Sequence, residues 1–179
     1  MALTSTVYNF DIALSDADRG VYEQLALRVA LHPSEAIEHM LTRVLAYCLE
    51  YQEGIAFSKG GISDGDQPAV SVSHPDGRIR AWIDIGMPDP ERLNKASKAA
   101  ERVAVYTHRD PAQLRRQAAG QRIHRAEEIA VYAIDRRFLE ELVPLVDRRT
   151  SLELTVTGGQ LYVTTGGKAL TGTVTEHRL

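Results

Sequence analysis

The stretch Arg78-Ile79-Arg80-Ala81-Trp82-Ile83-Asp84-Ile85 decides the fold of this chain and locates its candidate site. The three isoleucines and Ala81 alternate with the residues Arg80, Trp82 and Asp84, and a period of two is typical of a β-strand with one buried side. We therefore expect a strand that places its isoleucines in the core. Arg80, Trp82 and Asp84 should share the opposite face.

This strand is the second arm of a predicted β-hairpin. The first arm covers residues 69–73, and His74-Pro75-Asp76-Gly77 supplies the turn. Asp66 lies eighteen residues before Asp84, just ahead of the first arm, in a loop over residues 60–67 that is rich in turn residues. The hairpin therefore predicts that the two carboxylates lie on neighbouring strands.

Outward from the hairpin, the pattern predicts an α/β (α+β) fold with a central mixed β-sheet flanked by helices, in a single domain over residues 1–179. Predicted helices start at residue 16 or 18 and run to about 30, and cover 33–51, 90–100, 111–119 and 138–146; predicted strands cover 5–14, 55–58, 103–106 and 129–134. A β meander over residues 152–175, with turns at Gly158-Gly159 and Gly166-Gly167, follows.

Composition narrows the class of protein. The chain is 44% apolar and 25% charged, as soluble globular proteins are, and no apolar run approaches the roughly 18 residues of a membrane span. Its first residues lack the basic start and apolar core of a secretory signal, so we expect a cytoplasmic protein with no membrane partner. Cys48 is the only cysteine, which excludes an internal disulfide and a cysteine-based zinc cluster, and it lies on an apolar helical stripe as a core thiol would.

One segment is strongly basic although the chain as a whole is not. Residues 92–125 hold nine Lys or Arg against two acids, a local charge of +7 on a chain whose net charge is −3. Such a segment predicts an anion-binding face for nucleic acid, or else a set of solvated helix faces paired with acids elsewhere. The candidate nucleic-acid contacts are Arg80, Arg92, Lys98, Arg115 and Arg116.

Three carboxylates are candidate metal ligands. Asp66 and Asp84, with Glu35 from the start of a helix, would hold Mg²⁺ or Mn²⁺ and activate water, and Lys95 would stabilise the developing charge. Each has a structural alternative. Asp84 could pair with Arg80, Asp66 could serve its turn, Glu35 could favour a helix N-terminus, and Lys95 could pair with Glu91 four residues earlier.

Other enzyme classes find no support in the sequence. The chain has no Walker loop, no Gly-x-Gly-x-x-Gly after a strand, no Gly-x-Ser-x-Gly elbow and no His-Glu-x-x-His motif.

Four short motifs together resemble the YaeQ family: His32-Pro33-Ser34-Glu35, Asp66-Gln67-Pro68, the segment from Trp82 to Asp89, and Lys95-Ala96. The resemblance covers nearly the whole chain, and YaeQ proteins are similar in fold to the PD-(D/E)XK nucleases. It implies a restriction-endonuclease-like core, a C-terminal β meander and a pocket for a divalent cation.

The same resemblance assigns roles to single residues. Asp66 matches the first acid of the nuclease motif and Asp84 the second, while Gly86 stands where the motif has lysine. Lys95 would then supply the missing charge, and Glu35 matches a helix glutamate that some members add.

Two functions remain open at this point. The first is an Mg²⁺- or Mn²⁺-dependent nuclease or phosphodiesterase with Asp66, Asp84, Lys95 and Glu35 as its catalytic residues. The second is a catalytically degenerate domain of the same fold that binds nucleic acid or a protein partner in a regulatory role.

Overall fold

A computed structural model describes residues 4–60 and 65–179 of the chain, and most of these residues belong to one large mixed sheet. Ten strands of the described residues pair in the order β2-β1-β8-β9-β10-β7-β6-β5-β4-β3. Their bounds are β1 Thr6–Asp16, β2 Val21–Leu31, β3 Ile55–Phe57, β4 Val70–Ser73, β5 Ile79–Ile85, β6 Ala100–Thr107, β7 Ala130–Ile134, β8 Arg149–Thr157, β9 Gln160–Thr165 and β10 Lys168–Arg178. The helices are α1 Ile37–Leu49, α2 Pro90–Ala99, α3 Pro111–Ala118 and α4 Arg136–Leu142, with short 3-10 turns at Ala126–Glu128 and Val143–Leu145.

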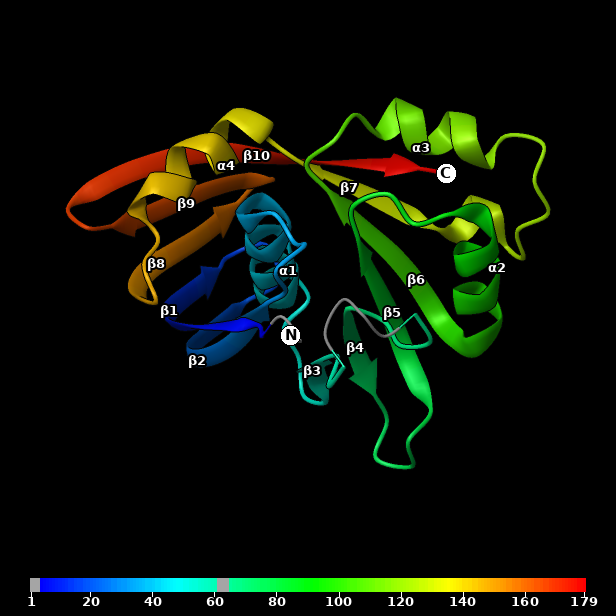
Figure 1. Cartoon of the computed structure of the whole chain (residues 1–179), viewed down its shortest axis with the longest axis horizontal. Coiled ribbons are helices and arrows are strands. Elements are labelled where there is room, and N and C mark those ends of the chain that lie inside the picture. The colour runs from blue at the N-terminus through cyan, green and yellow to red at the C-terminus, as the bar shows by residue number, and fades with distance from the viewer. Residues whose placement is uncertain (1–3, 61–64) are drawn as a thin grey trace.

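The last strand joins the two halves of this curved sheet. The first part of β10 pairs with β9, and its second part pairs with β7, so β10 runs across both halves (Figure 1). Strands β5, β6 and β7 are parallel, and the helical crossovers between them are what parallel neighbours require. The α/β class, the flanking helices and the C-terminal meander are therefore confirmed.

Helices cover the two faces of the β5–β7 region separately. Helix α1 lies between the two halves of the sheet, where its Leu41 and Val44 join Ile83 of β5 in the larger hydrophobic core (Figure 1). Helices α2 and α3 cover the other face, where Leu93 and Leu114 pack with Trp82 in a second core. The two faces of β5 and β6 consequently offer two separate environments.

Two predictions about the first 50 residues were wrong. The predicted helix from residue 16 or 18 to about 30 is the strand β2, which forms an antiparallel hairpin with β1. Leu25, Leu27 and Val29 are buried while their neighbours are exposed, so the segment has the period of two of a strand. The second helix begins later than predicted: α1 starts at Ile37, and Glu35 lies in a turn before it.

The other predicted elements are present with small shifts in their bounds. Asp89 caps α2 as predicted, because its carboxylate accepts a hydrogen bond from the backbone N–H of Arg92. The hairpin of β4 and β5 and the glycine turns of the meander are where the sequence places them. Cys48 is fully buried, and burial raises the pKa of its thiol to about 12, as expected of a core cysteine. Of the predicted loop at 60–67, residues 61–64 lie outside the described residues.

A β-bulge changes the faces that the alternation predicted for β5. Val72 pairs with Ala81 but Ser73 pairs with Ile79, so Arg80 is an extra residue between two paired positions. The prediction that Arg80 shares a face with Trp82 and Asp84 is therefore wrong. Ile79 packs instead against the core that contains Trp82, and Arg80 lines a cavity on the opposite face.

No helix among the described residues is both long and apolar enough to cross a membrane.

Candidate functional site

Asp84 is deeply buried, and it forms an ion pair. Its residue is 2% exposed, and both carboxylate oxygens accept hydrogen bonds from Arg92, from Nε at 2.8 Å and from Nη2 at 2.9 Å. This is the bidentate geometry in which guanidinium and carboxylate bind most strongly. The partner is Arg92 of α2, so the predicted pairing of Asp84 with Arg80 is wrong.

Arg92 also holds the loop that carries Asp66. It donates to the backbone carbonyls of Gly65 and Gln67, each at 2.7 Å, and its guanidinium carbon lies 5.6 Å from the centre of the Trp82 ring. One arginine therefore connects β5, α2 and the loop before β4. This role was missed at the sequence level, where Arg92 was assigned to nucleic acid.

Asp66 and Lys95 form a second ion pair beside the first. The Lys95 ammonium donates to the Asp66 carboxylate, and both side chains are largely exposed. The hydrogen bond from Lys95, together with its charge, lowers the pKa of Asp66 below its ordinary value. Asp66, Asp84, Arg92 and Lys95 thus lie together, and we call them the carboxylate cluster.

Glu35 has its own buried partners. Its carboxylate accepts from Nε of Arg43 at 2.9 Å and from Nη2 at 2.8 Å, and it lies 2.5 Å from Nδ1 of His39. Burial acts to raise the pKa of Glu35, but the hydrogen bond with His39 and the charge of Arg43 outweigh it and lower that pKa. All of these partners come from α1, so Glu35 does not complete the carboxylate cluster.

The carboxylates do not fit a divalent cation as they are arranged. Each of the three already has a cationic partner, and Mg²⁺ would need free oxygens converging on one point. Across residues 4–60 and 65–179, no group of three or more Asp, Glu, His or Cys could hold a metal ion.

Gly86 stands where the nuclease motif has lysine, and its backbone conformation suits glycine. Its φ is +87°, a conformation that side-chain-bearing residues rarely adopt. A Cβ at this position would lie 3.5 Å from the His39 ring. The backbone at the end of β5 therefore disfavours the lysine that the motif would place here.

The basic segment divides into paired and unpaired cations. Arg92, Lys95, Arg102 and Arg125 bind groups within the fold. The other five are exposed and have no ion-pair or side-chain hydrogen-bond partner in the part of the chain that the structure describes: Lys98, Arg109, Arg115, Arg116 and Arg122. Lys98 lies at the end of α2 and the adjacent Arg115 and Arg116 near the end of α3, so both helices of this layer present free cations.

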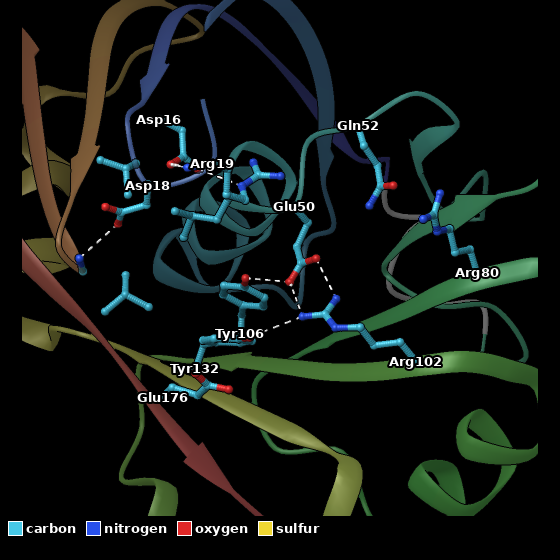
Figure 2. A pocket seen from close by; sticks show the side chains of 14 residues that line it. Asp16, Asp18, Arg19, Glu50, Gln52, Arg80, Arg102, Tyr106, Tyr132 and Glu176 are labelled. Atoms are coloured by element: carbon cyan, nitrogen blue, oxygen red, sulfur yellow. Dashed lines mark hydrogen bonds and ion pairs between the residues drawn. The ribbon is translucent and has the colours of Figure 1, made fainter. Parts of the chain in front are cut away.

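A cavity of about 570 Å³ lies on the other face of β5 and β6. It is bounded by the turn after β1, the end of α1 and strands β5, β6 and β7, and Figure 2 shows Arg80 and Gln52 at one end with Asp16 and Asp18 at the other. Its wall contains a network that sequence reasoning missed. Glu50 accepts two hydrogen bonds from Arg102, at 2.7 and 3.0 Å, and one from the Tyr106 hydroxyl at 2.8 Å.

Comparison with known proteins finds relatives that match nearly the whole chain. The sequence model of the family described as YaeQ protein matches residues 1–174. "Uncharacterized protein YaeQ" of Escherichia coli strain K12 is 30% identical over 164 residues, which is 91% of this chain and 90% of the relative, and its counterpart from Salmonella typhi matches equally.

Two solved structures have the same fold. The YaeQ protein from Pseudomonas syringae superimposes with a TM-score of 0.86 at 31% identity, covering 96% of this chain and 95% of the other. The YaeQ protein from Xanthomonas axonopodis pv. citri gives 0.86 at 27% identity, covering 98% and 99%.

Proposed function

The chain belongs to the YaeQ family, and from its site geometry we propose that it is a degenerate PD-(D/E)XK-type domain that binds nucleic acid without cleaving it. The order α1, β3, β4, β5, α2, β6 supports the superfamily placement. So does the position of the two acids, since Asp66 precedes β4 and Asp84 lies on β5.

We infer the absence of cleavage from the pairing of Asp84 with Arg92. Both of its oxygens accept hydrogen bonds from Arg92, whose guanidinium is fixed by two further carbonyls. A metal ligand has to offer at least one of those oxygens to the ion. Exchanging Arg92 for an ion would break four hydrogen bonds and free the loop at Gln67.

Nucleic-acid binding is supported by the exposed cations of α2 and α3. Lys98, Arg115, Arg116 and Arg122 lie on these two helices or directly after α3, and within the described residues none of their side chains is neutralised by an acid. Free guanidinium groups bind phosphate oxygens through bidentate hydrogen bonds and release counterions. Contacts of this kind attach to the backbone of a strand and do not read its sequence.

The test is fluorescence anisotropy with labelled duplex DNA, single-stranded DNA and RNA in EDTA, over a range of salt concentrations. The substitution Arg115→Gln with Arg116→Gln should weaken binding. For duplex it should reduce the slope of log affinity against log salt by about 1.8, since each phosphate contact contributes about 0.9.

A matched control exists on another helix. Arg136 and Arg137 are also adjacent, but each pairs with a glutamate four residues later, at 3.2 and 3.1 Å. Their double substitution to Gln should leave affinity and slope unchanged. Equal losses in both double variants, or binding that does not respond to salt, would refute this surface as the binding face.

Metal-dependent cleavage is the second candidate, because three of its four predicted catalytic residues, Asp66, Asp84 and Lys95, do lie together. It requires Arg92 to leave Asp84 when Mg²⁺ or Mn²⁺ and substrate bind. Incubating the wild type and Asp84→Asn with the same nucleic acids and either metal separates the two functions. Cleavage that the substitution abolishes would favour the nuclease, and no cleavage by either protein favours the binding domain.

A further inference from the structure

The cavity on the α1 side of β5 and β6 has the size and the polar groups of a small-molecule site. Its volume of about 570 Å³ falls within the roughly 300–1,000 Å³ typical of ligand pockets. Tyr106, which lines it, belongs to the larger core, whereas Asp84 and Trp82 lie toward α2. The cavity is therefore separate from both the carboxylate cluster and the basic face of α2 and α3.

One end of the cavity offers uncommitted donors. The bulge in β5 directs Arg80 to this end, and its guanidinium has no partner among the residues that the structure describes. The side-chain amide of Gln52 lies at the same end and is likewise without a hydrogen-bond partner there (Figure 2). Bulges often re-aim a side chain next to a functional site, and a free guanidinium facing a cavity suits an anionic group.

A hydrogen-bonded network occupies the middle of the cavity wall, and Arg80 is not part of it. The Arg102 guanidinium binds Glu50 through two nitrogens and also donates to the Tyr132 hydroxyl at 3.3 Å. The rings of Tyr106 and Tyr132 stack with centroids 4.8 Å apart. Since Glu50 neutralises Arg102, Arg80 contributes the net positive charge at this end. Tyr106 is buried beneath its partner, so the half-buried Tyr132 offers the aromatic surface.

The far end of the cavity offers carboxylate oxygens that already accept hydrogen bonds within the fold. The Asp16 carboxylate accepts from Arg19 at 2.9 Å, and Asp18 accepts from the backbone N–H groups of Gly158 and Gly159. Glu176 lies beside Tyr132 rather than at this end, and it pairs with Arg178 at 3.1 Å (Figure 2). A carboxylate oxygen has more than one lone pair, so these groups can still accept from a hydroxyl or an amino group.

We propose that this cavity binds a nucleoside monophosphate unit. The phosphate of this ligand lies at Arg80 and Gln52, its base packs on Tyr132, and its hydroxyl or amino groups donate to Asp16 and Asp18. The unit is either a free mononucleotide or the phosphorylated end of a strand. The proposal does not rest on nucleic-acid binding by α2 and α3, because the two sites share no residue.

The test is calorimetric titration of the wild-type protein with the four common ribonucleoside monophosphates. We expect saturable binding of at least one of them, with its unphosphorylated nucleoside at least about tenfold weaker, since a hydrogen bond to a charged group is worth that much. Arg80→Gln should weaken the monophosphate by a similar factor and leave the nucleoside unchanged, and Gln52→Ala should weaken the monophosphate less. Arg109→Gln is the matched control and should change neither, because Arg109 is exposed, lies outside the cavity and has no side-chain partner among the described residues.

A second arm separates the two sources of the ligand. If a short 5′-phosphorylated oligonucleotide competes with the monophosphate and loses affinity in Arg80→Gln, the site takes strand ends; if it does not compete, the site takes the free nucleotide, and either result supports the proposal. No saturation by any monophosphate would overturn it. Inorganic phosphate binding as tightly as the monophosphate, or Arg80→Gln binding like the wild type while circular dichroism shows both folded, would also overturn it.

Discussion

The carboxylate cluster and the cavity lie on opposite faces of β5, and their charged side chains differ in how they are paired. In the cluster, Asp84 and Asp66 each have a cation from α2, and Arg92 uses its remaining donors on the loop. In the cavity, Arg80 lies beside a neutralised pair and is itself unpaired among the described residues. Charged side chains that pair within the fold have few donors or acceptors left for a ligand, whereas a charged side chain that faces a cavity without a partner is available to one. Asp66 and Asp84, which match the nuclease motif, are therefore less available to a ligand than Arg80.

The largest effect should come from a predicted metal ligand that lies outside both regions. Glu35→Gln leaves the Arg43 guanidinium, whose side chain is 4% exposed, without its counter-charge, so the free energy of unfolding should fall by about 3–5 kcal/mol. Urea denaturation measures it. Glu38→Gln on the same helix is the control and should stay within about 0.5 kcal/mol. If Glu35→Gln is as stable as that control, the pair of Glu35 with Arg43 does not stabilise the fold.

Arg92→Met tests the closed state of the cluster itself. It strands the Asp84 carboxylate, which is 3% exposed, but Arg92 is 24% exposed, so the cost should fall at the lower end of the same range, about 3 kcal/mol. Lys98→Met, an exposed position on the same helix, should be nearly neutral. A stable Arg92→Met protein that gains saturable Mn²⁺ binding would show that Asp84 is a metal site blocked by the arginine.

The acid limb of the stability curve should carry the signature of Glu35. Because its pKa in the folded protein is lowered, its contribution is present above the ordinary value of about 4.5 and is lost as the pH falls through the folded pKa. The stability difference between wild type and Glu35→Gln should therefore shrink below about pH 4.5, by at most about 1.4 kcal/mol for each pH unit. A difference independent of pH down to about 3 would contradict the assignment.

Gly86→Ala should destabilise the protein by about 1 kcal/mol, because φ at this position is +87°. Contact with His39 adds little, since a Cβ 3.5 Å from the ring is in ordinary van der Waals contact. Gly65→Ala is the control, because Gly65 has no positive φ and a Cβ added there would have no atom within 4 Å. Equal costs for the two changes would mean that the end of β5 does not exclude a side chain.

The smallest effect is expected at Lys95. Its ion pair with Asp66 joins two largely exposed side chains, and such pairs contribute little to folding. Lys95→Ala should leave the urea midpoint unchanged in dilute buffer and in about 1 M salt, where exposed charges are fully screened. A clear drop in the midpoint would place Lys95 with Arg92 as part of the structure.

The elements that could be predicted from the sequence are those whose signals are local. Asp89 before Pro90 predicts the start of α2, and the glycine pairs predict the turns of the meander. The strand β2 was mistaken for a helix because Val21, Leu25 and Val29 also suit a helical stripe. A choice between the two periods depends on β1 as a pairing partner, which is tertiary information.

The site was predicted in composition but not in its connections. Spacing brought Asp66, Asp84 and Lys95 together correctly, yet it could not name Arg92 as the partner of Asp84, because that contact depends on how α2 packs on β5. A bulge has no reliable sequence signature, so the face on which Arg80 lies could not be predicted from the sequence. One signal was available: Arg43 lies in the apolar stripe of α1, and an arginine there requires a buried acid.

Whether the carboxylate cluster is closed to metal is tested most directly by a calorimetric titration of Mn²⁺ into the wild type and Asp84→Asn, with and without a short oligonucleotide. Because Arg92, Lys95 and Arg43 already neutralise the three carboxylates, we predict no saturable binding that depends on Asp84 in either condition. Saturable Mn²⁺ binding by the wild type that Asp84→Asn abolishes would contradict this prediction and favour metal-dependent cleavage as the function.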